Sequence, residues 1–245
     1  SSLKFVLYGA SPIADDTILK AKEIMKCDLF QVYGLTETAG AITILMPEDH
    51  DPEKGKLRSC GKVLNSVEIK VVDDEGNEVK TGDIGEVISK SPLNMKGYWN
   101  RPDATEEAIK DGWFYSGDAG FFDDEGYLYI HDRVKDMIVS GGENIYPAEV
   151  ENALMSHPEI ADAAVIGVPD DKWGESVKGF VVLQPDSSLD ETEIISYSRT
   201  QIAGYKCPKT INFIEALPRN PSGKILRREL REPFWEGKDR MVSGN

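Results

Sequence analysis

Short apolar runs and glycine turns alternate at the start of the chain. Residues 4–8 form an apolar run that ends at Gly9, and residues 29–33 form a second one that ends at Gly34. Between them, residues 15–25 carry apolar side chains at helical spacing. This order predicts a β-α-β unit whose two strands end side by side. Because ligands bind beyond the carboxyl ends of parallel strands in such sheets, we expect a binding site at these two turns.

From about residue 42 the pattern changes to short strands separated by polar turns. The predicted strands cover residues 67–71, 86–88 and 127–130. Residues 73–76 and 123–126 are acidic tetrapeptides that end in glycine, and they predict hairpin turns because they lack the ligand spacing of an EF-hand. A short helix is predicted over residues 101–110. The segment from 42 to 134 is therefore expected to form a small β-barrel-like subdomain.

The rest of the chain mixes helices with strands, which predicts a compact α+β lobe. Predicted helices cover residues 147–156, 191–202 and 226–231, and predicted strands cover residues 163–168, 177–183 and 210–214. A charged break at residues 132–136 is typical of a domain boundary, although a solvated hairpin tip fits it too. The whole chain is predicted to be α+β. A first domain covers residues 1–134 (β-α-β remnant 1–41, β subdomain 42–134), and a second covers residues 135–245.

Composition narrows the classes of function. The formal net charge is −15, from 28 basic and 43 acidic residues, and so acidic a surface repels phosphate backbones, which argues against nucleic-acid binding. With 40% hydrophobic residues the chain is expected to be globular, and none of its apolar runs reaches the length of a membrane span. Cys27, Cys60 and Cys207 are scattered and odd in number, which predicts reduced thiols in a cytoplasmic compartment. The sequence indicates no oligomeric state.

The clearest candidate chemistry lies in Tyr33-Gly34-Leu35-Thr36-Glu37. A strand that stops at Gly34 leaves backbone N–H groups free to bind an oxyanion. Thr36 can donate a hydrogen bond to a phosphate oxygen, and Glu37 can bind Mg²⁺, which prefers oxygen ligands. The structural alternative is a strand, a turn and a helix N-terminus with Thr36 as its cap.

Four stretches, in this order along the chain, resemble motifs of the acyl-adenylate-forming (AMP-dependent) synthetase superfamily. They are Tyr33–Glu37, Tyr115-Ser116-Gly117-Asp118, Asp132-Arg133-Val134-Lys135-Asp136 and Pro221-Ser222-Gly223-Lys224. The resemblance extends from about Phe5 to Glu232, and chance agreement of four ordered motifs is far rarer than agreement of one. Residues 144–149 look more similar to acyl-CoA synthetases than to the adenylation domains of peptide synthetases.

The resemblance implies an adenylate site in the first domain. The residues that it assigns to nucleotide binding are Gly9, Ala10, Ser11, Tyr33, Gly34, Asp118, Ile130 and Arg133. In the family, the turn at Gly9 lies against adenine, Asp118 accepts hydrogen bonds from both ribose hydroxyls, and Arg133 approaches the ribose or a phosphate. Thr36 and Glu37 are assigned to catalysis, with Glu37 as the magnesium ligand.

The resemblance also implies a small, mobile second domain. By the resemblance, Lys135 is expected to be its hinge. The residues assigned to the tunnel for the pantetheine arm of coenzyme A are Ser140, Gly141, Gly142 and Glu143. The resemblance also implies that this domain delivers Lys224 to the bridging oxygens between a carboxylate and the α-phosphate, where negative charge concentrates. From the residues alone, Lys224 is a solvated lysine on a turn.

Together these assignments predict an AMP-forming acid–thiol ligase. With Mg²⁺, a carboxylic acid and ATP give acyl-AMP and pyrophosphate, and coenzyme A then takes the acyl group and releases AMP. Two other hypotheses stay open: an adenylation domain that loads a carrier protein, and a non-catalytic nucleotide-binding or interaction module. The sequence shows neither the family's Ser/Thr/Gly-rich phosphate loop nor a segment for an acyl pocket. We therefore interpret the chain as the C-terminal part of such an enzyme, inactive when alone.

Overall fold

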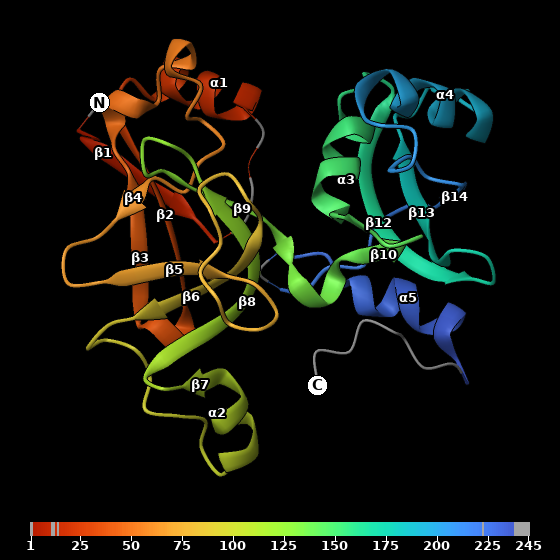
Figure 1. Ribbon diagram of the computed structural model, residues 1–245. Helices are drawn as coiled ribbons and strands as arrows, with labels where there is room; N and C mark the ends of the chain where they lie inside the picture. Colours follow the sequence, from red (N-terminus) through yellow and green to blue (C-terminus); the bar gives the residue numbers. More distant parts are fainter. Residues whose placement is uncertain (1, 11–12, 14, 222, 238–245) are drawn as a thin grey trace. The chain divides into compact units, whose positions relative to one another are not determined.

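The computed structural model describes residues 2–10, 13, 15–221 and 223–237. The chain has two compact units, an N-terminal unit (Ser1–Ile130) and a C-terminal unit (His131–Asn245), and the division falls inside a β-strand (Figure 1). Each unit has its own sheets and its own buried hydrophobic clusters. The fold class is α+β, as the sequence predicts.

The first sheet of the N-terminal unit contains the predicted β-α-β unit, and its strand order is β1-β2-β3-β4. β1 (Phe5–Gly9) runs parallel to β2 (Asp28–Leu35), and α1 (Asp15–Met25) connects them. Ile18 of α1 is almost fully buried and packs in one cluster with Leu29 of β2. The two parallel strands therefore end at the same edge of the sheet, as the apolar pattern predicts.

The prediction that the second strand stops at Gly34 is wrong. β2 continues to Leu35, with an irregular register between Tyr33 and Gly34. The antiparallel strand β3 (Gly40–Leu45) passes so close that a Cβ on Gly34 would collide with the Gly40 carbonyl oxygen. Glycine is needed at this position for the close approach of two strands, and not for a turn.

The start of the second sheet also differs from the expectation. β3 pairs with β2 and with the two-residue strand β4 (Lys62–Val63), so both lie in the first sheet. Two single-turn 3-10 helices, η2 (Pro47–Asp49) and η3 (Pro52–Lys54), lie between β3 and β4. The second sheet begins at residue 68 and not at residue 42, because hydrophobic alternation does not reveal which strands pair.

The second sheet is curled and has the strand order β5-β6-β8-β7, with β9 also paired to β8 (Figure 1). Its strands are β5 (Glu68–Val72), β6 (Gly85–Lys90), β7 (Ile109–Lys110), β8 (Trp113–Phe122) and β9 (Leu128–Arg133). Val87 and Leu128 are fully buried in its core. α2 (Pro102–Ala108) is shorter than predicted because the next two residues pair with β8 as β7.

The two acidic tetrapeptides form hairpin turns, as predicted. The side chain of Asp73 accepts hydrogen bonds from the backbone N–H groups two and four residues later, and Asp123 accepts the equivalent pair. Asp73 N–H also donates to the Asn77 carbonyl oxygen, and Asp123 N–H donates to the Tyr127 carbonyl oxygen. These bonds close each turn and use one carboxylate oxygen of each aspartate, Oδ1, within the turn.

The C-terminal unit has one sheet of five strands, in the order β11-β10-β13-β12 with β14 parallel to β13. Its strands are β10 (Ile138–Ser140), β11 (Glu143–Ile145), β12 (Ile160–Asp170), β13 (Gly174–Leu183) and β14 (Thr210–Phe213). Its helices are the 3-10 turn η4 (Val134–Asp136), α3 (Pro147–Met155), α4 (Glu191–Gln201) and α5 (Arg227–Trp235). Among the described residues, no helix is both long and apolar enough to span a membrane.

Helices cover both faces of this sheet, so its central strands are apolar on both sides. Val165 of β12 is buried in a cluster with residues of α3 and α4, whereas the next residue, Ile166, is buried in a second cluster with residues of α5. In Figure 1 the two helices α3 and α4 accordingly lie away from α5 across the strands of this unit. The position of α5 matters for the site, because its chain emerges directly from the turn that contains Lys224.

Candidate functional site

The ends of β1 and β2 form the first part of the candidate site. Gly9 lies opposite Val32, and a Cβ on Gly9 would collide with the Val32 carbonyl oxygen, so only glycine fits there. Ala10 follows with φ +66°, a conformation that alanine rarely adopts. The third residue predicted for this turn, Ser11, lies outside the described residues.

The segment after β2 is a single 3-10 turn, η1 (Thr36–Thr38), and Leu35 is its N-cap. The structural alternative, in which Thr36 is the cap, is wrong, because Thr36 is already the first residue of the turn. Thr38, which is buried, makes the capping contacts instead: its hydroxyl accepts from Leu35 N–H at 2.9 Å and lies 2.7 Å from the Gly40 carbonyl oxygen. Thr36 is exposed, which leaves its hydroxyl accessible to a ligand.

Glu37 is partly buried and held by a distant loop. The Tyr98 hydroxyl donates to Glu37 Oε1 at 2.9 Å, and Met95 N–H donates to the Glu37 carbonyl oxygen at 2.7 Å. Sequence reasoning missed Tyr98, since nothing in the motif points to a residue 61 positions away. Within the described residues no group of three or more His, Cys, Asp or Glu side chains surrounds Glu37. One carboxylate without a protein cage fits Mg²⁺ that arrives with nucleotide phosphates and keeps several waters.

Asp118, on β8, is only 5% exposed and lies beside Tyr33 of β2. The Tyr33 hydroxyl donates to Asp118 Oδ2 at 2.6 Å. Burial, together with this carboxylate, raises the pKa of Tyr33 far above its usual range, so the hydroxyl keeps its proton and remains a donor. Ile130 packs against the same hydrophobic cluster as Tyr33. The fold thus brings together three predicted residues from three separate stretches of sequence.

The backbone that leads into Asp118 lies at a register irregularity between β6 and β8, and hydrogen bonds hold it there. Ser116 Oγ donates to the Val87 carbonyl oxygen at 2.6 Å and accepts from Asp118 N–H at 3.0 Å. Gly117, at φ +69°, donates its N–H to Glu86 Oε1 at 2.8 Å. Burial raises the pKa of Glu86. Glu86 was missed from sequence because an isolated glutamate in a strand carries no motif.

In the C-terminal unit, the predicted hinge segment is anchored rather than free. Lys135 is exposed in η4, but Asp132, three residues earlier, has only 5% of its side chain exposed. Asp132 Oδ2 accepts from Ala148 N–H at 2.9 Å, and Oδ1 accepts from Arg133 N–H at 2.8 Å. The alternative of a solvated hairpin tip is therefore wrong for Asp132.

Two arginines of α5 bind the acidic residues of this segment. Arg227 Nη1 lies 3.8 Å from Asp132 Oδ1. The Arg227 guanidinium also makes a bidentate contact with the Glu151 carboxylate of α3, with hydrogen bonds of 3.2 and 2.7 Å. One turn later, Arg231 donates to Asp136 at 3.1 Å. Burial raises the pKa of Asp132 and of Glu151, and the positive charge of Arg227 opposes that rise.

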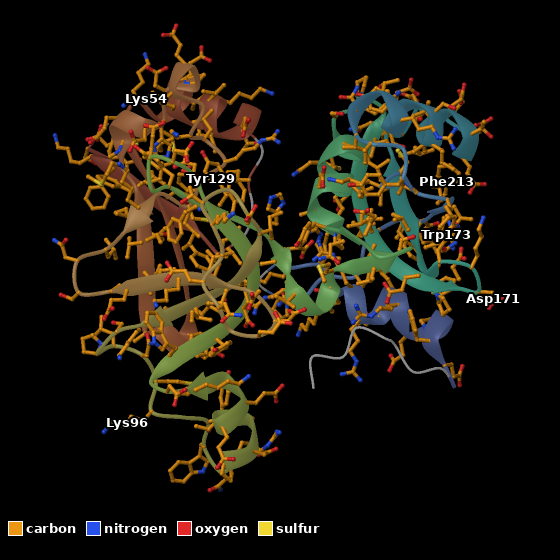
Figure 2. The ribbon with its side chains drawn as sticks, in the orientation of Figure 1. Lys54, Lys96, Tyr129, Asp171, Trp173 and Phe213 are labelled. Carbon is orange, nitrogen blue, oxygen red and sulfur yellow. The ribbon has the colours of Figure 1, made fainter. Side chains whose placement is uncertain are left out.

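The predicted coenzyme A loop is the two-residue turn of the β10–β11 hairpin, which Ser140 and Glu143 flank as a pair. Gly141 and Gly142 have φ of +64° and +86°, values that suit a tight hairpin turn. Gly141 N–H donates to the Trp173 carbonyl oxygen at 2.8 Å, and a Cβ on Gly141 would lie 2.7 Å from the Trp173 ring. Trp173 belongs to the segment between β12 and β13 (Figure 2). A Cβ on Gly142 would meet nothing within 4 Å.

Lys224 is exposed on a turn whose backbone is fastened at several points. Asn220 N–H donates to the Lys224 carbonyl oxygen and Asn220 Oδ1 accepts from Lys224 N–H, both at 2.9 Å. Arg219 donates to the Gly223 carbonyl oxygen and to Asp162 of β12, both at 2.6 Å. The amino group thus extends from a turn that is tied to the sheet, while Ser222 of the same motif lies outside the described residues.

Comparisons with known proteins identify the family of the chain. Residues 1–99 match the AMP-binding enzyme family, and residues 149–224 match the AMP-binding enzyme C-terminal domain. The chain belongs to the adenylate-forming superfamily of AMP-binding enzymes.

Among its relatives, a fatty acid–[acyl-carrier-protein] ligase of Streptomyces coeruleorubidus is 43% identical over 99% of this chain and 47% of the relative. A long-chain-fatty-acid–CoA ligase of Mycobacterium tuberculosis is 43% identical over 94% of this chain and 45% of the relative. The o-succinylbenzoate CoA synthetase of Bacillus subtilis, solved with its acyl-adenylate intermediate, is 41% identical, with a TM-score of 0.85 over 94% of this chain and 46% of that one. The same synthetase has been solved with ATP and magnesium ion. The chain spans about half the length of these relatives.

Proposed function

We propose that the chain works as part of an acyl-CoA synthetase that activates a carboxylic acid in two steps. In the first, a carboxylate oxygen attacks the α-phosphate of ATP, the bond to the β-phosphate breaks, and acyl-AMP and pyrophosphate result. In the second, the thiol of coenzyme A attacks the acyl carbonyl carbon and loses its proton, and AMP leaves. Here "complete enzyme" means this chain together with the further sequence that its relatives carry.

The N-terminal unit would bind the nucleotide. Asp118 offers two carboxylate oxygens for the ribose hydroxyls, and Tyr33, Ser116 and the Glu86 contact hold the strand that carries it. Gly9, Ala10, Ser11, Tyr33, Gly34 and Ile130 would complete the nucleotide site of this unit. Arg133, which belongs to the C-terminal unit, would approach the ribose or a phosphate. Thr36 would donate to a phosphate oxygen and Glu37 would hold Mg²⁺, which neutralises charge on the phosphates when bound.

The C-terminal unit would supply Lys224 to the first step and the β10–β11 turn to the second. Lys135 would be the hinge about which the unit turns between them, and the pantetheine arm would pass Ser140, Gly141, Gly142 and Glu143. The observation that carries the proposal is the direct Tyr33–Asp118 hydrogen bond, because it joins two of the four motifs in one site. The names of the relatives support the acid–thiol ligase class.

An activity assay can identify which thiol accepts the acyl group. Coenzyme A is the acceptor named for the mycobacterial relative, and an acyl-carrier protein is the acceptor named for the streptomycete relative. Supplying the complete enzyme with ATP, a panel of fatty and aryl acids, and either thiol separates the two candidates. Acyl transfer to coenzyme A alone supports the proposal. Transfer to a carrier protein alone would show that the acceptor is the thiol of a carrier protein, and the proposed first step, formation of acyl-AMP, would stand.

We expect the isolated chain of 245 residues not to adenylate carboxylic acids. Positioning of the reactants supplies much of the rate, and the chain spans about half of each relative. Carboxylate-dependent exchange of pyrophosphate into ATP is the measurement. Exchange above the background without acid contradicts the expectation.

Gly142→Leu in the complete enzyme is expected to slow transfer to coenzyme A by roughly 10- to 100-fold and to leave acyl-AMP formation near the parent rate. The space beside Gly142 is open, so a branched side chain would fill the path proposed for the pantetheine arm. Pyrophosphate release and acyl-CoA production are measured in parallel.

Gly82→Leu is the matched control, because Gly82 also has a positive φ, +89°, and open space around it, but lies in the N-terminal unit. This variant measures the effect of placing leucine at a positive φ, without filling the path proposed for the pantetheine arm. Equal losses of both products in Gly142→Leu contradict a role of this turn in one step.

A further inference from the structure

The hydroxyl of Tyr98 contacts the one carboxylate that the proposed function gives to magnesium. Tyr98 donates to Glu37 Oε1 at 2.9 Å, and among the described residues no hydrogen bond reaches Glu37 Oε2. One oxygen is therefore held by the protein while the other stays open to a ligand. Mg²⁺ requires near-ideal octahedral geometry, so the orientation of a single protein carboxylate affects how well the ion is bound.

The loop that carries Tyr98 is fixed at both of its ends. At its start, Met95 N–H donates to the Glu37 carbonyl oxygen at 2.7 Å. At its end, Tyr98 N–H donates to Thr105 Oγ1 of α2 at 2.9 Å. A Cβ on Gly97 would lie 2.7 Å from the Thr105 side chain, so glycine lets the loop approach α2. Tyr98 is therefore held on α2 by its backbone and reaches Glu37 with its hydroxyl.

We infer that Tyr98 is a positioning residue that orients the Glu37 carboxylate for Mg²⁺. This inference rests on the proposed function, which gives Glu37 its metal. Hydrogen-bond partners of ligating carboxylates fix their orientation, and loss of such a partner typically weakens metal binding by about 10- to 100-fold. Tyr98 does not itself contact the metal or the reacting atoms.

Tyr98→Phe removes the hydroxyl and keeps the ring. In the complete enzyme with ATP present, we expect Mn²⁺, used as a spectroscopic probe, to bind about tenfold more weakly than in the parent when free Mn²⁺ is measured by electron paramagnetic resonance. The Mg²⁺ concentration for half-maximal acyl-AMP formation should rise by a similar factor. At saturating Mg²⁺ the rate should approach that of the parent.

Tyr129→Phe is the matched control. Tyr129, labelled in Figure 2, also donates from its hydroxyl to a carboxylate, Asp123 Oδ2 at 3.3 Å, but on a hairpin turn of the second sheet. It removes a hydrogen bond of the same kind and should leave Mn²⁺ binding unchanged. A purely structural Tyr98 would instead lower the thermal unfolding midpoint of Tyr98→Phe without changing Mn²⁺ binding, and that result overturns the inference.

Glu37→Gln separates failure of the inference from failure of the proposed function. If Glu37→Gln weakens Mn²⁺ binding and Tyr98→Phe does not, Glu37 keeps its proposed role and the role of Tyr98 is rejected. If Glu37→Gln binds Mn²⁺ as well as the parent, the proposed metal role of Glu37 fails, and the inference fails with it. If both single variants weaken binding, the double variant should bind no more weakly than Glu37→Gln alone, because Tyr98 acts only through that carboxylate.

Discussion

Replacing Lys224 with alanine in the complete enzyme is expected to slow acyl-AMP formation by roughly 10²- to 10³-fold, the usual cost of losing one preorganised partner of transition-state charge. Lys224 is exposed on a turn that Asn220 and Arg219 fasten to the C-terminal unit, an arrangement suited to presenting an amino group to a ligand. Transfer from pre-formed acyl-AMP to coenzyme A should stay near the parent rate, because the proposed rotation withdraws the lysine before that step. Single-turnover assays of each step measure the two effects separately.

Lys80→Ala is the control for loss of one exposed positive charge, since Lys80 is exposed and lies in the N-terminal unit. It should change neither step. A parent-like rate of acyl-AMP formation in Lys224→Ala would show that Lys224 is a solvated turn lysine and would remove the main catalytic residue from the proposal. Equal slowing of both steps would contradict the rotation.

Local chemistry in the sequence predicted several elements closely. α1 has the predicted bounds, Asp15–Met25, because helical spacing of apolar residues is a property of consecutive positions. The turns at Asp73 and Asp123 follow from side chains that bond their own backbone a few residues later. Such elements need no knowledge of distant partners.

Several failures depend on strand pairing and on contacts that the local pattern does not reveal. Gly34 was taken as the end of a strand, but its glycine is required by the Gly40 carbonyl oxygen of the neighbouring strand. β3 and β4 pair within the first sheet, and the sequence does not show this because the possible partner strands have similar apolar patterns. From the sequence, Asp132 looks like a solvated charge in a polar stretch. Its side chain is only 5% exposed, and Arg227, 95 positions further on, lies 3.8 Å from it.

For the candidate site, the motifs supplied the residues with chemical roles and left out the residues that hold them. Asp118 and Glu37 were predicted from the resemblance, and their roles remain proposals. Their partners Glu86 and Tyr98 were not predicted, because each is a common residue type in an unremarkable stretch. The positions of these partners follow only from the paired strands and from the loop that α2 holds.

The buried charges around Arg227 give the largest expected effect on stability. Arg227, Glu151 and Asp132 have side-chain exposures of 18%, 12% and 5%, so little solvent screens them. Arg227→Met keeps much of the side-chain volume but leaves two buried carboxylates without their cation. Removing one partner of a buried ion pair typically costs about 3–5 kcal/mol of unfolding free energy. We expect a loss of this size in the C-terminal unit, measured on the full chain by urea unfolding.

Amide hydrogen exchange shows which part of the C-terminal unit loses stability in Arg227→Met. Val165 N–H donates to Glu151 Oε1 at 2.8 Å, and Ala148 N–H donates to Asp132 Oδ2 at 2.9 Å, so both amides should exchange faster in Arg227→Met. Arg228→Met is the matched control, because the side chain of Arg228 is 83% exposed and lies 3.6 Å from an exposed glutamate. Its effect should stay within about 0.5 kcal/mol. Equal losses in the two variants would mean that the burial of Arg227 carries no special cost.

The pH dependence tests whether charge is the cause. Burial already raises the pKa of Asp132 and Glu151, and removal of Arg227 takes away the charge that opposes the rise. A carboxyl whose folded-state pKa is raised contributes stability below its unfolded pKa and loses that contribution as the pH rises through the folded value. The deficit of Arg227→Met should therefore be large near pH 7 and shrink as the pH falls towards the unperturbed pKa of about 4, because carboxyls with a raised pKa take up protons above that value. A deficit that does not change with pH would point to lost packing. Arg227 is the first residue of α5 and follows Lys224 by three positions, so this network lies at the base of the turn that carries Lys224.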